Sequence, residues 1–181
     1  MGSKNVIKSN PETWQKHEQD TAQKAAIMCL LFALRSHDVA CTRYAISVLH
    51  ADVNRKISDG SPQMHSAIRF LRPEIRGDVE SVLANLKLLI DAGADVNMRD
   101  CCGETALCVA ISHGSVEVVE FLLDKGAAIV DIDSNGSNVV DYVAANAASD
   151  PAMVQLVKER YREMCLDWWT AAGPAPTPGG V

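Results

Sequence analysis

The sequence predicts an all-α fold in which short helices stack as repeated helix-turn-helix units, and three observations support this. Residues 105–112 and 116–125 are short apolar runs with helical spacing, and glycine separates them. Glycine also recurs at a fixed distance, because 33 residues separate Gly93 from Gly126. Two short helices joined by a turn cannot bury both of their apolar faces alone. The pattern therefore predicts a solenoid in which each unit covers its neighbours.

Two helices are expected at the N-terminal end. The first runs over 11–35, with Asn10 as its cap and proline in its first turn. Its segment 25–34 is apolar nearly all round, so we expect that segment to be buried. Asp38 then caps a second helix over 39–49.

The next unit is longer than the one that follows it. Its helices are expected over 62–71 and 78–92. It carries ten extra residues near 72–78, where Pro73 ends or kinks the first helix. Insertions in a repeat map to loops, and such a loop can be either functional or simply tolerated surface length.

Two further helices are expected after the central unit, over 138–147 and 151–167. The many charges of the last helix suit an outer capping face. We expect residues 1–9 and the Pro/Gly-rich segment 171–181 to be disordered.

Specific motifs give these units a family resemblance. The sequence TALCVA at 105–110 partly matches the family pattern T-P-L-H-x-A, and GADVN at 93–97 matches its exit pattern. The exit recurs as HADVN at 50–54, and the turn glycine recurs at Gly60 and Gly136. The chain thus resembles ankyrin-repeat proteins over residues 20–161. The resemblance implies short β-turn fingers and four units in domain 10–170, of which the first and last are degenerate: 11–54, 55–97, 98–130 and 131–169.

The resemblance also implies a function, because ankyrin repeats are binding scaffolds with a concave surface of fingers and first helices. In this chain the fingers would be 52–59, 95–102 and 128–135, and Gln63 and Ser66 would face the same surface. Trp168 and Trp169 cannot both face inward on one helix, so an exposed tryptophan is a further expected contact. We expect a non-enzymatic protein-interaction module whose partner-binding residues are Arg55, Lys56, Asp95, Asp100, Glu104, Asp131, Asp133 and Trp169.

The distribution of charge favours a basic protein partner. The net charge is −6, which argues against nucleic acid as a partner. Residues 91–150 contain eleven acids and two bases, so the later fingers are acidic. Such a surface attracts positive charge, although Asp95 and Asn97 could equally serve the turn backbone.

A second class of function stays open, in which a small stand-alone enzyme or small-molecule-binding protein, for example an isomerase or cyclase, uses the concave pocket. His65 with neighbouring carboxylates would then perform acid-base work. His65 also occupies the histidine position of the repeat pattern, where a structural hydrogen bond between repeats is the simpler interpretation. The sequence shows no phosphate loop, nucleophile elbow or zinc-protease motif, so we expect no catalytic residues and no cofactor.

The six cysteines do not form a recognisable framework. Cys101, Cys102 and Cys108 lack zinc-finger spacing, and adjacent cysteines cannot easily both reach one tetrahedral ion, so no metal site is expected. No apolar run is long enough to span a membrane, and the N-terminus does not resemble a signal peptide. We therefore expect a cytoplasmic monomer with reduced thiols.

Overall fold

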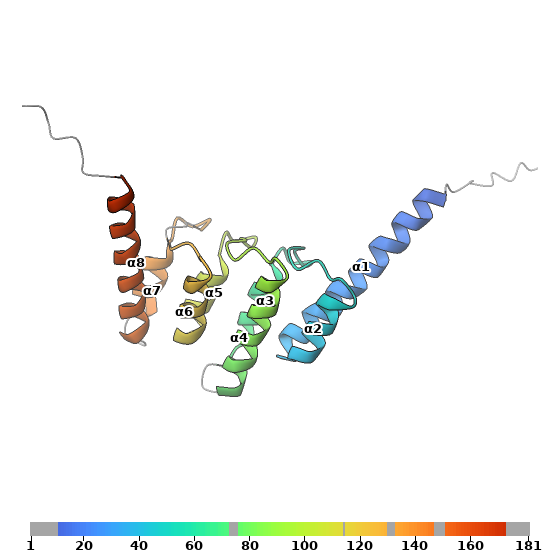
Figure 1. Cartoon of the computed structure of the whole chain (residues 1–181), viewed down its shortest axis with the longest axis horizontal. Coiled ribbons are helices and arrows are strands. Elements are labelled where there is room, and N and C mark those ends of the chain that lie inside the picture. Colours follow the sequence, from blue (N-terminus) through green and yellow to red (C-terminus); the bar gives the residue numbers. More distant parts are fainter. Residues whose placement is uncertain (1–10, 73–75, 114, 130–132, 147–150, 173–181) are drawn as a thin grey trace, which may run out of the picture.

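The computed structural model describes residues 11–72, 76–113, 115–129, 133–146 and 151–172. Within these ranges the protein has eight helices and no strand (Figure 1). The helices are α1 Pro11–Arg35, α2 Val39–Ser47, α3 Gln63–Arg69, α4 Arg76–Asp91, α5 Ala106–Ser112, α6 Val116–Asp124, α7 Val139–Asn146 and α8 Pro151–Ala172. The predicted all-α class is confirmed.

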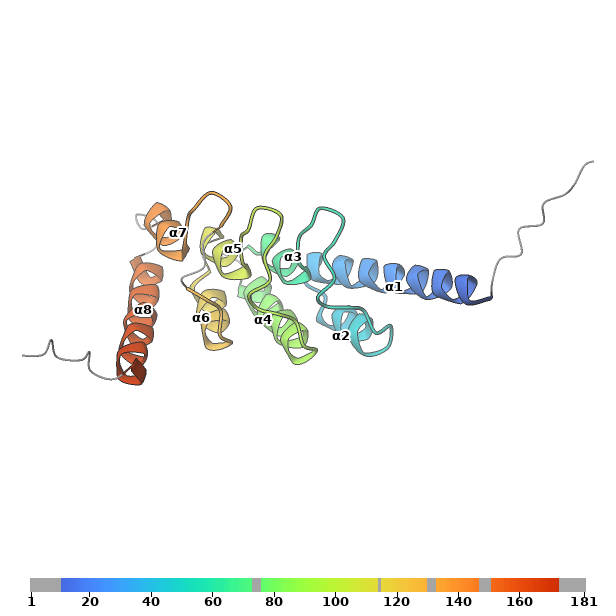
Figure 2. The same ribbon diagram turned by 90° about the horizontal axis from the view of Figure 1, so that it is seen from above.

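The helices form two layers. Seen from above, α1, α3, α5 and α7 make one row, and α2, α4, α6 and α8 make the other (Figure 2). Each helix contacts the next one of its own row and the partner of its own pair. A loop projects from the α1–α7 row between successive units (Figure 2). This arrangement is the predicted solenoid.

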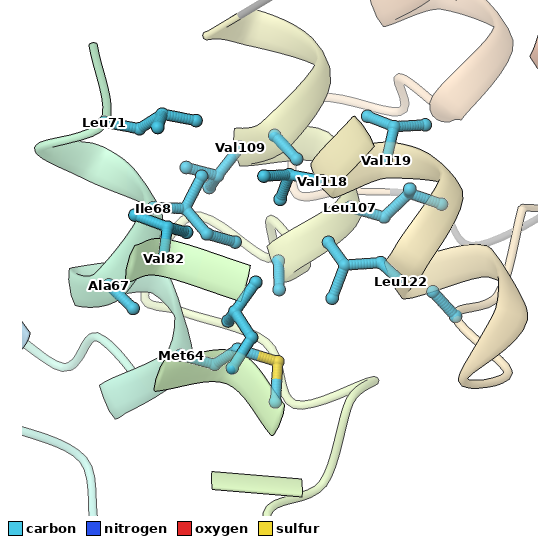
Figure 3. Close-up of a cluster of buried hydrophobic side chains, with 14 of the residues drawn as sticks. Met64, Ala67, Ile68, Leu71, Val82, Leu107, Val109, Val118, Val119 and Leu122 are labelled. Carbon is cyan, nitrogen blue, oxygen red and sulfur yellow. The ribbon is translucent and has the colours of Figure 1, made fainter. Parts of the chain in front are cut away.

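The core lies between the units. Side chains from α3, α4, α5 and α6 meet in one cluster, in which Met64, Ile68 and Val82 face Leu107 and Leu122 (Figure 3). All of these side chains are buried. Burying one leucine contributes about 2 kcal/mol, so helices of only seven to nine residues gain their stability from neighbours rather than from helix propensity.

Three tight turns close the loops, and all share one backbone geometry. We call them the first turn (57–61), the second turn (100–104) and the third turn (133–137). In each, the N–H of the first residue donates to the carbonyl of the fifth, at 2.9, 3.0 and 2.8 Å. The fourth residue is a glycine with a φ of about +80°, which L side chains rarely adopt. The recurring glycines of the sequence therefore have a stereochemical cause.

The N-terminal pair confirms one prediction fully and another only in part. Asp38 caps α2 as predicted, because its side chain accepts a hydrogen bond from the Cys41 N–H. The expected burial of 25–34 is confirmed on one side of α1, where Leu30 and Leu34 are buried. It was wrong on the other side, since Met28 is 63 % exposed and Phe32 is 74 % exposed. Helix α1 ends the stack, so only one side of it faces a neighbouring unit.

Some boundaries differ from those expected. Helix α4 begins at Arg76 rather than at residue 78, and the Pro73 segment lies outside the described residues. Helix α8 continues to Ala172, so residues 171 and 172 belong to the helix and not to the expected tail. The predictions of disorder for 1–9 and 173–181 also concern residues outside the described ranges.

Candidate partner-binding surface

Asp100 is a structural residue of the second turn. Its side chain has no exposed surface, and its Oδ2 pairs with the Arg69 guanidinium at 2.7 Å. Its Oδ1 accepts hydrogen bonds from the N–H groups of Cys102 and Glu104, at 2.8 and 3.0 Å. We therefore exclude Asp100 from the candidate surface, because a carboxylate enclosed by these donors cannot contact a partner.

Glu104 and Asp133 form an acidic pair at the next junction. The Tyr142 hydroxyl of α7 lies 2.7 Å from Glu104 Oε1 and 2.9 Å from Asp133 Oδ2. All three residues are only half-buried. The structure thus brings together two of the predicted acids from consecutive units. Tyr142, which sequence reasoning did not single out, is the residue that joins them.

Hydrogen bonds and burial shift the pKa values of Asp133 and Tyr142 in this cluster. The Ser137 N–H, followed by weaker contributions from Tyr142 and Asn135, lowers the pKa of Asp133, so that carboxylate stays ionised at neutral pH. Burial raises the pKa of Tyr142, and the two carboxylates raise it further. Tyr142 therefore keeps its single hydrogen, which cannot be donated to both carboxylates at once.

The remaining described residues of the predicted set are spread along the loops. Arg55 and Lys56 are exposed, and Arg55 lies 3.5 Å from Asp20 of α1. Asp95 is exposed, and its Oδ1 accepts a hydrogen bond from the Asn97 N–H. The turn role considered for Asp95 is thus present.

The other predicted surface positions are either outside the described residues or buried. Asp131 is outside the described residues, and so is the side chain of Trp169, although its backbone belongs to α8. The placement of Gln63 and Ser66 on the surface was wrong, since both are buried within α3. Helix α3 is buried over its whole length except its last residue, because units pack on both of its sides.

His65 joins two units. Its Nε2 donates to the Glu104 carbonyl at 2.8 Å, and its side chain is fully buried. Burial lowers the pKa of His65, although the hydrogen bond to Glu104 and the charge of Asp100 oppose the shift. A side chain without exposed surface cannot meet a substrate, so the acid-base role considered for His65 is contradicted by its placement.

Two asparagines hold neighbouring loops together, a contact that goes beyond the turn role considered for Asn97. Asn54 donates to the Gly93 carbonyl and accepts from the Asp95 N–H, each at 2.8 Å. Asn97 repeats the pattern one unit later, with the Gly126 carbonyl at 3.2 Å and the Ala128 N–H at 2.8 Å. The recurrence of asparagine at the end of each exit motif was the available signal.

Known proteins show the same organisation. A family model described as ankyrin repeats, in three copies, matches residues 78–165. The chain is an ankyrin-repeat protein. The family resemblance of the turn and exit motifs is thereby confirmed, and ankyrin repeats are in general protein–protein interaction modules.

Several curated proteins are similar to this ankyrin-repeat chain. Serine/threonine-protein kinase 12 of Arabidopsis thaliana is 35 % identical over 82 residues, which are 45 % of this chain and 17 % of the kinase. Ankyrin repeat domain-containing protein 63 of Homo sapiens is 24 % identical over 149 residues, or 82 % of this chain and 37 % of that protein. Ankyrin repeat and SAM domain-containing protein 6 of Rattus norvegicus is 28 % identical over 117 residues, covering 63 % and 13 % of the two chains.

The chain thus spans well under half the length of each of these relatives. None of the helices that the structure describes is both long enough and apolar enough to cross a membrane.

Proposed function

We propose that this ankyrin-repeat domain is a non-enzymatic interaction module that binds a basic segment of a partner protein. The binding surface consists of the exposed loops and the adjoining ends of the first helices, centred on Glu104 and Asp133. The supporting observation is that these two carboxylates, from consecutive units, share the single hydroxyl of Tyr142.

The chemistry of this cluster favours a cationic side chain as its ligand. One hydroxyl hydrogen satisfies one carboxylate at a time, so the cluster retains negative charge that an arginine or lysine of the partner could pair with. Asp95 adds negative charge on the neighbouring loop. Paired and half-buried carboxylates also hold a guanidinium more strongly than isolated surface acids do.

The fold supports the same function, because the surface is formed before binding. The turns are closed by backbone hydrogen bonds, and Asn54 and Asn97 bind successive loops to one another. A preformed surface loses less conformational entropy on binding than a flexible one. The partner's charge then determines orientation and the rate of association.

The test uses a fluorescently labelled peptide rich in arginine and lysine, with an acidic peptide of equal length for comparison. We expect the wild-type chain to bind the basic peptide preferentially, in a salt-dependent manner, by fluorescence anisotropy. Glu104→Lys should weaken this binding at least about tenfold, which corresponds to about 1.4 kcal/mol.

The matched control is Glu120→Lys, which makes the same charge change at an exposed position of α6. It should leave the affinity within about twofold of wild type, because Glu120 lies on a second-row helix and not on a loop or a first helix. Equal losses in the two variants, or equal binding of the basic and acidic peptides, would contradict the proposal.

A further inference from the structure

The second turn presents two adjacent thiols. Cys101 and Cys102 are both exposed, and their Sγ atoms are 3.9 Å apart. The first and third turns have Ser58 with Asp59, and Ser134 with Asn135, at the same two positions. The vicinal dithiol is therefore specific to the second turn, although all three turns share one backbone geometry.

Contacts from three directions hold this turn in place. The Asp100 carboxylate accepts the Cys102 N–H at 2.8 Å, and the Cys102 carbonyl accepts the Ser134 N–H at 2.9 Å. On the opposite side, Gly60 of the first turn approaches Cys101 so closely that a Cβ on that glycine would lie 3.3 Å from the Cys101 Cβ. The backbone that carries both sulfurs is thus fixed before any ligand arrives.

The distance between the two sulfurs is closer to that of two thiolates bound to one ion than to that of a disulfide. Two thiolates bound to a tetrahedral ion at about 2.3 Å each lie about 3.8 Å apart. The observed 3.9 Å agrees with this separation. A disulfide needs sulfurs about 2.05 Å apart on Cα atoms separated by about 4.4 Å or more, whereas adjacent Cα atoms are only about 3.8 Å apart. At this separation both adjacent sulfurs can reach one tetrahedral ion, although the sequence analysis expected no metal site.

A carboxylate lies beside the two sulfurs. An oxygen of the Asp100 carboxylate and the two sulfurs all lie within 4.8 Å of one another. That carboxylate already accepts hydrogen bonds from Arg69 and two backbone N–H groups, so it orients the turn rather than bonding to the metal directly. A group that holds the ligand residues in place strengthens a metal site without binding the ion itself.

We propose that Cys101 and Cys102 chelate one thiophilic divalent cation of the Zn²⁺ class, with water completing its tetrahedral shell. Binding converts two thiols to two thiolates and releases two protons to the solvent. The cation must displace those protons, so affinity should fall as the pH is lowered.

The experiment titrates Cd²⁺, and separately Zn²⁺, into the reduced full-length chain. Binding of Cd²⁺ is followed by the ultraviolet thiolate-to-metal charge-transfer band, and binding of Zn²⁺ by competition with a chromophoric chelator. The diagnostic variant is the double substitution Cys101→Ser with Cys102→Asn, which gives the second turn the residues of the third. We expect one equivalent of Cd²⁺ in the wild type and affinity at least about tenfold lower in the variant.

The matched control is Cys41→Ser, which removes an exposed cysteine outside the turn and should leave the band unchanged. Circular dichroism of each variant reports whether the helices are retained. A band of equal strength in the double variant would assign binding to other cysteines and overturn the proposal. Absence of the band in the wild type, or its loss in Cys41→Ser, would overturn it as well.

Discussion

The second and third turns have the same local structure but use their aspartates differently. Asp100 and Asp133 each begin a turn, and each Oδ1 accepts the N–H groups two and four residues further on. The second oxygen of Asp100 is buried against Arg69, whereas that of Asp133 meets the half-buried hydroxyl of Tyr142. The neighbouring helix, and not the turn motif, thus determines whether the carboxylate serves stability or remains near the surface.

Substituting each of the two aspartates by alanine tests this difference, and it has the largest effect on stability that we expect. Asp100→Ala should lower the free energy of unfolding by about 3 to 4 kcal/mol, because it removes a buried carboxylate and leaves two part-buried backbone N–H groups and the Arg69 charge without their partner. Asp133→Ala should cost only about 1 kcal/mol, since water can replace its side chain. Urea unfolding followed by circular dichroism measures both values. Similar losses in the two variants would mean that the burial of the Asp100 oxygen is unimportant.

A second prediction concerns the glycines of the same two turns. A Cβ at Gly103 would lie 2.8 Å from the Ser134 nitrogen, whereas a Cβ at Gly136 meets nothing within 4 Å. Both glycines have positive φ, so alanine at either position lowers the free energy of unfolding by about 1 kcal/mol through backbone strain. Gly103→Ala should cost about 2 to 3 kcal/mol in total because the third turn must also move.

Thermal unfolding of the two glycine variants, measured side by side, gives this comparison directly. If Gly136→Ala were as destabilising as Gly103→Ala, then the close approach of the second and third turns would not be needed for stability.

The smallest predicted effect concerns the contact between each turn and the first helix of the preceding unit. His65 donates to the carbonyl of Glu104 in the second turn, whereas Cys108 stands at the corresponding position before the third turn. Burial lowers the pKa of His65 in the folded state, so the unfolded chain binds the proton more readily. Stability should therefore fall as the pH drops below about 6.5, by at most about 1.4 kcal/mol per pH unit.

His65→Gln should flatten this pH dependence, because glutamine can still donate to the Glu104 carbonyl but does not titrate. His50→Asn is the matched control, since His50 is exposed and asparagine tolerates its positive φ. Urea midpoints measured from neutral to mildly acidic pH provide the test. An equal slope in wild type and His65→Gln would show that another group carries the pH dependence.

Most of the fold follows from local chemistry in the sequence. Glycine at the fourth position of each turn, Asp38 at a helix cap and the apolar spacing of 105–125 are short-range signals, and their structures agree with them. The exposure of Met28 and Phe32 could not be predicted in this way. A fully apolar helix looks the same in sequence whether it lies inside a stack or at its end.

The candidate surface was less predictable than the fold, because every acid near a turn looks equally suitable in the sequence. Composition identified the acidic loops, and Glu104, Asp133 and Asp95 remain candidates in the structure. Asp100 is excluded from the candidate surface because its carboxylate pairs with Arg69, which lies 31 residues away along the chain. Tyr142 was missed because its contact with Glu104 spans 38 residues.

The sequence by itself determined that this protein is a stack of ankyrin repeats, since the period, the turn glycines and the apolar spacing are properties of short segments. The tertiary structure decided which polar groups form hydrogen bonds or ion pairs within the stack and which remain exposed to a partner. That decision depends on contacts between units, where the energy of a carboxylate or a thiol is set by whichever side chain the next unit places beside it.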